Sequence, residues 1–266
     1  MKQSLVRFSL SALALCFVFA GTVAAQDFQK SYRVGAGGIV TLRNVSGDIA
    51  ITGYDGDSVT VNGFKEGRDR DRVEVEDLST GNHVDIRAKY PNNCNNCEAS
   101  IRFEVRVPRS SRLNFDKIST ASGNLKATGV SGELNLQTAS GDVLVSDVDG
   151  TIKASTASGE MQIREVKGTV SASSASGNVD VQIARLEGAQ DLKFSSASGN
   201  VNVKLPNNLD ANVHLSTATG SISTDFPLEV KTSEHGPGST ARGQLGSGAR
   251  SLRISSASGD VSLKSL

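Results

Sequence analysis

Two cysteines are the first residues of this sequence that could do chemistry. Cys94 and Cys97 form a Cys-x-x-Cys motif in the segment Pro91–Cys97. A redox pair of this kind needs a helix N-terminus to lower the thiol pKa, and no helix is predicted here. A zinc site needs two more ligands, and His83 is the only histidine nearby. In a chain that carries an export signal, we therefore predict a disulfide between Cys94 and Cys97.

A pair of carboxylates is the second candidate for chemistry. Asp142 and Glu160 each follow a glycine directly and lie 18 residues apart. If 18 residues make one coil of a repeat, both belong to an aligned row of Asn124, Asp142, Glu160, Asn178 and Asn200. Adjacent carboxylates can perform acid/base catalysis or hold a cation. The position after a turn glycine also favours short polar residues for structural reasons, and we adopt this interpretation.

Other catalytic or ligand-binding patterns are not found. His83, His214 and His235 are too scattered for a Ser-His-Asp constellation. The absence of Trp and the low number of Tyr argue against an aromatic platform for sugars. A calcium-binding β-roll would need Gly-Gly-x-Gly-x-Asp units, whereas each unit here has one glycine and no Asp at a fixed offset. We predict no catalytic, cofactor-binding or metal-binding residues and no cofactor.

The residues above must be positioned by a repeat, which the glycines reveal. The tetrapeptide Thr/Ser-Ala-Ser-Gly returns at residues 120–123, 138–141, 156–159 and 174–177, a period of 18. A second glycine series with Val two residues earlier divides each unit in half. Such a short fixed period is typical of a solenoid. The predicted turn glycines are Gly123, Gly132, Gly141, Gly150, Gly159, Gly168, Gly177, Gly199, Gly220 and Gly259.

The residues between the glycines predict strands. Positions +2 and +4 after each glycine are apolar, as in Val143 and Val145, while position +3 is mostly polar. Period-two alternation indicates a strand with one buried face. We expect the Ala or Val two residues before each glycine to point inward as well. The fold prediction is all-β: a right-handed parallel β-solenoid with about 18 residues and two short strands per coil, and a less regular N-terminal part with longer strands.

The chain divides into three predicted parts. Residues 1–25 combine the charged Lys2 and Arg7 with an apolar run and a Val-Ala-Ala cleavage site, which is typical of a secretory signal peptide; a retained membrane helix is the alternative. Residues 26–112 form irregular β coils with the Cys94/Cys97 loop. Residues 113–266 form the regular repeats, in which 235–248 is a Gly-rich loop and Leu252–Leu263 is the last coil.

The charge balance of the mature chain excludes one class of partner. Removing Lys2 and Arg7 from 28 basic and 28 acidic residues leaves 26 and 28, a net charge near −2. This balance does not predict binding to nucleic acid or to an anionic membrane surface. We expect no transmembrane anchor in the mature chain. The sequence leaves the oligomeric state open.

The repeats resemble a known family. The segment Val45-Ser46-Gly47-Asp48-Ile49, the strand end Val105-Arg106-Val107-Pro108, the Ser-Ala-Ser-Gly-Asn/Asp corners and the Gly-rich loop before the closing Ser-Gly-Asp are similar to the bacterial DUF4097 adhesin-like β-strand-repeat family. The resemblance covers nearly the whole mature chain. It implies an exported, non-catalytic β-solenoid of the periplasm or cell surface, an adhesin or interaction scaffold for an envelope protein or glycan. A polysaccharide-active enzyme on the same scaffold is the alternative.

Overall fold

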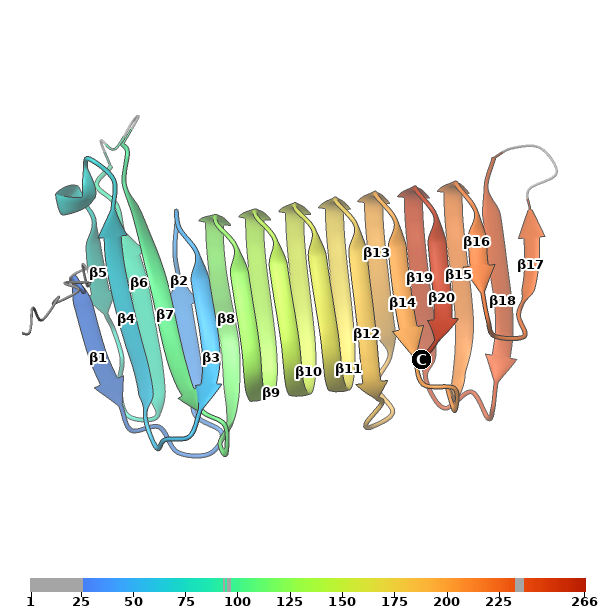
Figure 1. Cartoon of the computed structure of the whole chain (residues 1–266), viewed down its shortest axis with the longest axis horizontal. Helices are drawn as coiled ribbons and strands as arrows, with labels where there is room; N and C mark the ends of the chain where they lie inside the picture. The colour runs from blue at the N-terminus through green and yellow to red at the C-terminus, as the bar shows by residue number, and fades with distance from the viewer. Residues whose placement is uncertain (1–25, 93, 95–96, 233–236) are drawn as a thin grey trace, which may run out of the picture.

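The computed structural model describes residues 26–92, 94, 97–232 and 237–266, so the predicted signal peptide lies outside the described residues. In the described part, the strands stack as coils along one long axis (Figure 1). One short 3-10 helix, η1 (Arg70–Arg72), interrupts them near the N-terminal end. The all-β parallel solenoid expected from the sequence is confirmed.

The centre of the stack is strictly periodic. Strands β9 (Leu125–Ser140), β10 (Val143–Ser158) and β11 (Met161–Ser176) pair in parallel, with Val143 opposite both Leu125 and Met161. This register equals the 18-residue sequence period. Each of these strands runs without a break through the glycine of the second series, namely Gly132, Gly150 or Gly168. The sequence predicted two short strands separated at this glycine. In the coils after β11, the two halves are separate strands.

The shared interior is apolar. Val143, Val145 and Val148 are each 2% exposed or less, and their counterparts in neighbouring coils are buried with them. One contiguous core extends through the stack from Val34 to Leu263, without a break near residue 112. Burying one such aliphatic side chain contributes about 1.5–3 kcal/mol, so the inward rows supply the main driving force for stacking.

The corner glycines are needed for two reasons, as Gly141 illustrates. Its φ is 151°, a value that residues with a side chain rarely adopt. A Cβ atom on Gly141 would lie 2.0 Å from the carbonyl oxygen of Gly123 in the coil below. The corner therefore requires glycine both for its backbone conformation and for the close approach of successive coils.

The prediction for the corner alanines is wrong. Ala139 and Ala157 are exposed, whereas Thr138 and Thr156, one residue earlier, are 7% and 6% exposed and point inward. The hydroxyl can be buried because it donates a hydrogen bond to a glycine carbonyl of the neighbouring coil: Thr138 Oγ1 lies 3.0 Å from Gly123 O. Alanine, which needs no partner, takes the exposed position of the bend.

At the N-terminal end, the spatial order of the coils differs from the chain order. The coil of β2 and β3 lies between the coil of β6 and β7 on one side and β8 and β9 on the other, with all these pairings parallel. Strands β4, β1 and β5 add antiparallel edges to β7, β4 and β6. The strands here are β1 (Phe28–Tyr32), β2 (Ile39–Arg43), β3 (Ile49–Tyr54), β4 (Val59–Glu66), β5 (Glu74–Asp77), β6 (His83–Lys89), β7 (Ser100–Pro108) and β8 (Arg112–Ser122).

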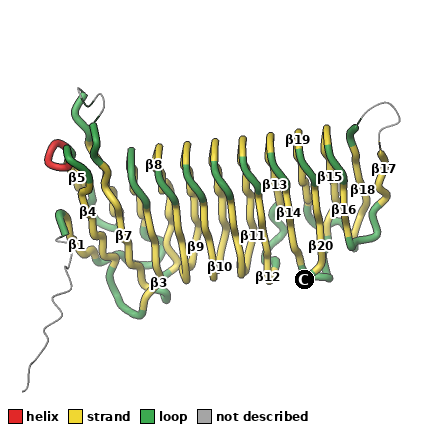
Figure 2. The backbone as a smooth tube through the Cα atoms, turned by 45° about the horizontal axis from the view of Figure 1, so that its top comes forward, coloured by secondary structure: helices red, strands yellow, loops and turns green. Residues whose placement is uncertain are grey.

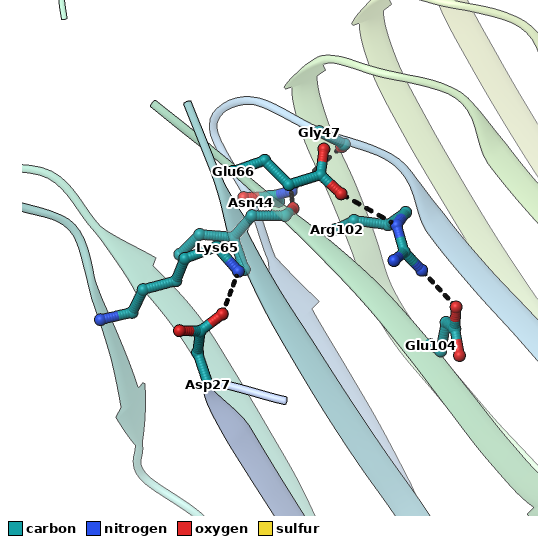
Figure 3. A network of polar contacts seen from close by, with 8 residues as sticks. Asp27, Asn44, Gly47, Lys65, Glu66, Arg102 and Glu104 are labelled. Atoms are coloured by element: carbon teal, nitrogen blue, oxygen red, sulfur yellow. Dashed lines mark hydrogen bonds and ion pairs between the residues drawn. The ribbon is translucent and has the colours of Figure 1, made fainter. Parts of the chain in front are cut away.

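Polar contacts hold this end together (Figure 3). Arg102 on β7 contacts Glu66 on β4 at 3.2 Å and also Glu104. The backbone N–H of Lys65 donates to Asp27 at 2.7 Å. The amide of Asn44 donates to the carbonyls of Gly47 and Ile101, at 3.0 and 2.7 Å, and so ties the β2–β3 corner to the start of β7.

The C-terminal end has a matching rearrangement. The sequence predicted that Leu252–Leu263 forms the last coil, but this coil is inserted between two earlier ones: β19 pairs with both β13 and β15, and β20 with both β14 and β16. Figures 1 and 2 show this coil inside the stack. The strands are β12 (Val179–Arg185), β13 (Leu192–Ser198), β14 (Val201–Leu205), β15 (Ala211–Thr219), β16 (Ile222–Thr224), β19 (Ser251–Ser258) and β20 (Val261–Ser265).

The predicted Gly-rich loop 235–248 is wrong for half of its length. Residues Ser239–Leu245 form β18, which pairs antiparallel with β15 and with β17 (Glu229–Thr232). Buried Ala241 and Leu245 alternate with exposed residues and pack onto the outermost coil. Residues 235 and 236 lie outside the described residues.

Candidate functional site

The row of acids and amides at the corner is brought together as predicted, and its members bond to one another. The backbone N–H of Glu160 donates to Asp142 Oδ1 at 2.8 Å, and that of Asp142 donates to Asn124 Oδ1 at 2.8 Å. Asn178 and Asn200 continue the pattern. The ladder also includes Asp48 and Asp260 at its two ends, which the sequence analysis did not include.

In this ladder the carboxylates have a structural role. The side-chain oxygens of Asp48, Asn124, Asp142, Asn178 and Asn200 each satisfy the N–H that follows a corner glycine in the next coil, a donor that the bent backbone leaves without a strand partner. At Glu160 the ladder changes, because its carboxylate accepts the side-chain amide of Asn178 at 3.4 Å. The pair that could have been an acid/base site thus takes part in the stacking of the coils.

A hydroxyl ladder runs beside it on the inner side of the corner. Eight buried Thr and Ser side chains among the described residues each donate to the carbonyl of a corner glycine one coil away, at 2.8–3.4 Å. The donors are Thr120, Thr138, Thr156, Ser174, Ser196, Thr217, Ser239 and Ser256. All of them except Ser239 stand three residues before a glycine, a recurrence that the sequence carries as a signal.

The cysteines and histidines lie apart from each other. A disulfide joins Cys94 and Cys97 between β6 and β7. His83 Nε2 lies 3.0 Å from Thr41 Oγ1 near the N-terminal end, and His214 belongs to β15 at the other end. His235 lies outside the described residues. Within the described ranges, no three His, Cys, Asp or Glu side chains gather as metal ligands would.

A shallow trough runs along one face, which we call the serine trough. Its floor is a row of serine side chains and one glutamine, each one residue before the hydroxyl ladder, and the exposed corner alanines border it. It consists of two hollows that share Ser174 and Ala175, so it extends from β8 to β15. The floor residues are Ser119, Gln137, Ser155, Ser173, Ser195, Ser255 and Ser216.

A row of cations follows the trough, which we call the basic row. Its members on the parallel strands lie two residues before the floor residues, on the same face, because side chains alternate along a strand; Arg242 on the antiparallel β18 joins them opposite His214. Parallel pairing places Lys153, Ser171, Lys193 and Arg253 on successive strands. The cationic members are Lys117, Lys153, Lys193, Arg253 and Arg242, all exposed.

The basic row went unnoticed in the sequence, although a signal exists. Lys117, Lys153, Lys193 and Arg253 all stand six residues before a corner glycine. Reading only the apolar positions of the repeat hides this recurrence, because the charge of an outward position does not affect the core. The corner glycines thus predict the alignment of surface charge as well as that of the core.

The electrostatic effect of the row is seen at His214. Its ring lies between Arg253 on β19 and Arg242 on β18, and its Nδ1 accepts a hydrogen bond from Arg242 Nε at 2.9 Å. Burial, with the positive charges of Arg242 and Arg253, lowers the pKa of His214. The C-terminal half of the row is therefore a region of positive potential.

Stacked parallel coils of 18 residues with glycine corners define this protein as a β-solenoid, and a comparison of the sequence with family models gives the family. The model described as Toastrack DUF4097 matches residues 39–264. The chain belongs to this family. The match includes both the irregular N-terminal coils and the inserted C-terminal coil.

Three solved structures are similar in fold. They come from Clostridium sporogenes ("putative cell adhesion protein"), Bacteroides fragilis ("putative adhesin") and Parabacteroides distasonis ("putative lipid binding protein"). Sequence identities are 14%, 14% and 15%, and TM-scores are 0.36, 0.36 and 0.40. The alignments cover 90% of this chain and 99%, 96% and 96% of the others. No curated protein matches the chain.

Proposed function

We propose that this protein is an exported, non-catalytic β-solenoid of the cell envelope that acts as an adhesin-like interaction scaffold. The observation that carries the proposal is the serine trough with its basic row, a long, open and repetitive face. Such a surface suits binding to an extended partner, because it repeats the same contact from coil to coil. An enzyme would need an enclosed and pre-organised group of reactive side chains.

Two features support export. Residues 1–25 have the charge, apolar run and small-residue site of a signal peptide. The Cys94–Cys97 disulfide fits an oxidising compartment such as the periplasm or cell surface. No helix in the described part of the chain has the length and apolar character needed to span a bilayer.

The structural hydrogen bond between Asp142 and Glu160 supports a role without catalysis. Asp142 Oδ1 already accepts the N–H of Glu160 and so takes part in the stacking of two coils. The described histidines are each engaged, His83 beside Thr41 and His214 by Arg242. A glycosidase places two carboxylates on either side of the scissile bond, whereas Asp142 and Glu160 lie on adjacent coils that a hydrogen bond between them joins.

Fractionation and binding assays test the proposal. The full chain should appear without residues 1–25 in the periplasm or at the cell surface, as shown by N-terminal sequencing of the fractionated protein. The purified protein should bind isolated envelope material saturably and leave its glycans intact. Retention of residues 1–25 in the cytosol would refute export. Glycan turnover that Asp142→Ala abolishes would instead support the polysaccharide-active enzyme.

A further inference from the structure

The basic row contains cations that no carboxylate neutralises. Lys153, Lys193 and Arg253 are exposed, and none of them forms an ion pair within the described residues. Lys264 near the same end of the solenoid is, by contrast, paired with Asp225 at 3.0 Å. A line of unpaired cations on a protein with near-zero net charge is a local feature with its own ligand preference.

The spacing of these cations is set by the strand stack. Neighbouring strands are about 4.8 Å apart, so Lys153 and Lys193, separated by Ser171, are about 10 Å apart along the axis. Arg253, His214 and Arg242 follow Lys193 on consecutive strands. The positive charges thus form a straight line whose density increases toward the C-terminal end.

The acids of this face lie near its ends or are engaged by other groups. Asp116 and Glu133 line a hollow at the β8–β9 end of the row together with Lys153. The carboxylate of Asp191 accepts the N–H of Ser251 at 2.8 Å. Glu229 on β17 stands opposite Arg242, and its carboxylate pairs with Lys231 at 3.2 Å. Lys193 and Arg253 are therefore the part of the row best able to receive negative charge, with Lys153 at the edge of this part.

We propose that an extended acidic polysaccharide binds along this face, with its anionic groups on Lys153, Lys193 and Arg253 and its hydroxyl groups on the floor of the serine trough. The inference rests on the proposed scaffold function and names the partner class. A spacing of two strands is comparable to one disaccharide of an extended chain, so every second sugar could place its carboxylate, sulfate or phosphate at a cation. The trough hydroxyls donate and accept hydrogen bonds, as sugar hydroxyls require.

Other polyanions fit less well. Binding of single-stranded nucleic acid depends on aromatic side chains for base stacking, and the outward positions of the described basic row and trough hold no Phe, Tyr or Trp. A membrane surface would require apolar side chains beside the cations. The exposed Leu144 and Val230 do not belong to the row or to the trough floor.

The test uses the purified mature protein and four probes at low ionic strength: polygalacturonate, dextran sulfate, neutral dextran and single-stranded DNA. We expect binding to one or both acidic polysaccharides, weakening as salt rises, with no binding to neutral dextran and weaker binding to DNA. The two acidic probes distinguish carboxylate from sulfate recognition. Tighter binding to DNA than to either acidic polysaccharide would overturn the inference.

Charge-reversal variants locate the site. The triple variant Lys153→Glu, Lys193→Glu, Arg253→Glu should weaken polysaccharide binding at least about tenfold, since each substitution replaces an attraction by a repulsion. The matched control is Lys126→Glu, Arg164→Glu, Lys204→Glu, which makes the same charge change at exposed positions of the other sheet face. This control should change the affinity by less than about threefold. Equal losses in both variants would overturn the inference.

Two measurements keep the result interpretable. If the triple variant does not fold, as judged by circular dichroism, the double variant Lys193→Gln, Arg253→Gln should still weaken binding more than Arg164→Gln, Lys204→Gln does. Binding of a polyanion should also raise the pKa of His214, because negative charge would offset Arg242 and Arg253, and NMR can follow this resonance. Envelope binding that persists without any affinity for acidic polysaccharides would refute this inference and leave the scaffold proposal intact.

Discussion

Replacing Gly141 by alanine tests whether the close approach of the coils requires glycine. The change forces a side chain into a backbone with φ of 151°, which costs about 1–3 kcal/mol. The new Cβ would also lie 2.0 Å from Gly123 O, so the two coils must separate locally. A forced shift of this kind costs a further 1–3 kcal/mol or so. We expect the free energy of unfolding to fall by about 2–6 kcal/mol in total, a large share of the stability of a typical domain.

Gly188→Ala is the matched control. Gly188 also has a positive φ, 72°, but a Cβ there would meet nothing within 4 Å. Its cost should be about 1–2 kcal/mol, from the backbone alone. Urea unfolding of the wild type and both variants measures the difference, with the denaturant slope checked for constancy. Equal destabilisation by the two substitutions would refute the reasoning that coil contact, beyond backbone conformation, dictates glycine at the corners.

Three further predictions concern single side chains. Thr156→Val should lower the free energy of unfolding by about 1 kcal/mol, because it removes the hydrogen bond of 3.2 Å to Gly141 O, whereas Thr156→Ser should cost little; thermal melting of both variants checks this. Glu165→Gly should raise the melting temperature, with a gain of about 0.5–1 kcal/mol, because Glu165 has a φ of 55° that glycine adopts freely; a fall would contradict the strain argument. Burial disfavours the charged form of Asp77, but hydrogen bonds from Lys30 and from Ser79 outweigh it and lower the pKa of Asp77 from 3.8 to about 2. The stabilisation by ionised Asp77 is therefore present above pH 4 and lost as the pH falls toward 2, so Asp77→Asn should cost about 1 kcal/mol at pH 7 and much less at pH 2, as measured by urea unfolding at both pH values.

The sequence predicts the periodic part of the fold well because one physical rule determines it. Glycine spacing fixes the register, so Leu125, Val143 and Met161 align as their positions in the repeat predict. The row from Asn124 to Asn200 also follows directly from the period. Both results need only the length of the coil and the alternation of side chains along a strand.

The misassigned corner alanines show where this reasoning stops. Alternation counted forward from buried Ile152 and Ala154 places Thr156 inside and Ala157 outside, as observed. Counting backward from Gly159 crosses the bend, where alternation does not hold, and places Ala157 inside. The hydrophobicity of alanine also favoured an inward Ala157. The hydrogen bond that allows Thr156 to be buried is made to another coil, so the local sequence does not reveal it.

The order of the coils is beyond the reach of local sequence pattern. The corner Ser256–Gly259 has the same residues as Ser196–Gly199, so nothing in its composition specifies its neighbours. Its place in the stack follows from β15–β18. These strands precede it in the sequence but occupy the outer position of the stack. The serine trough and the basic row depend on this order, because it brings Arg253 beside Lys193.

The inserted coil has a consequence for biosynthesis. Residues 251–266 are synthesised after β13–β16, yet they provide the surface on which β15 and β16 pair and the partner for β13 and β14. Strands β15 and β16 therefore cannot dock as they are made and must wait until residues 251–266 have been synthesised. A product truncated after residue 250 would expose two sets of unpaired strand edges, which are templates for aggregation.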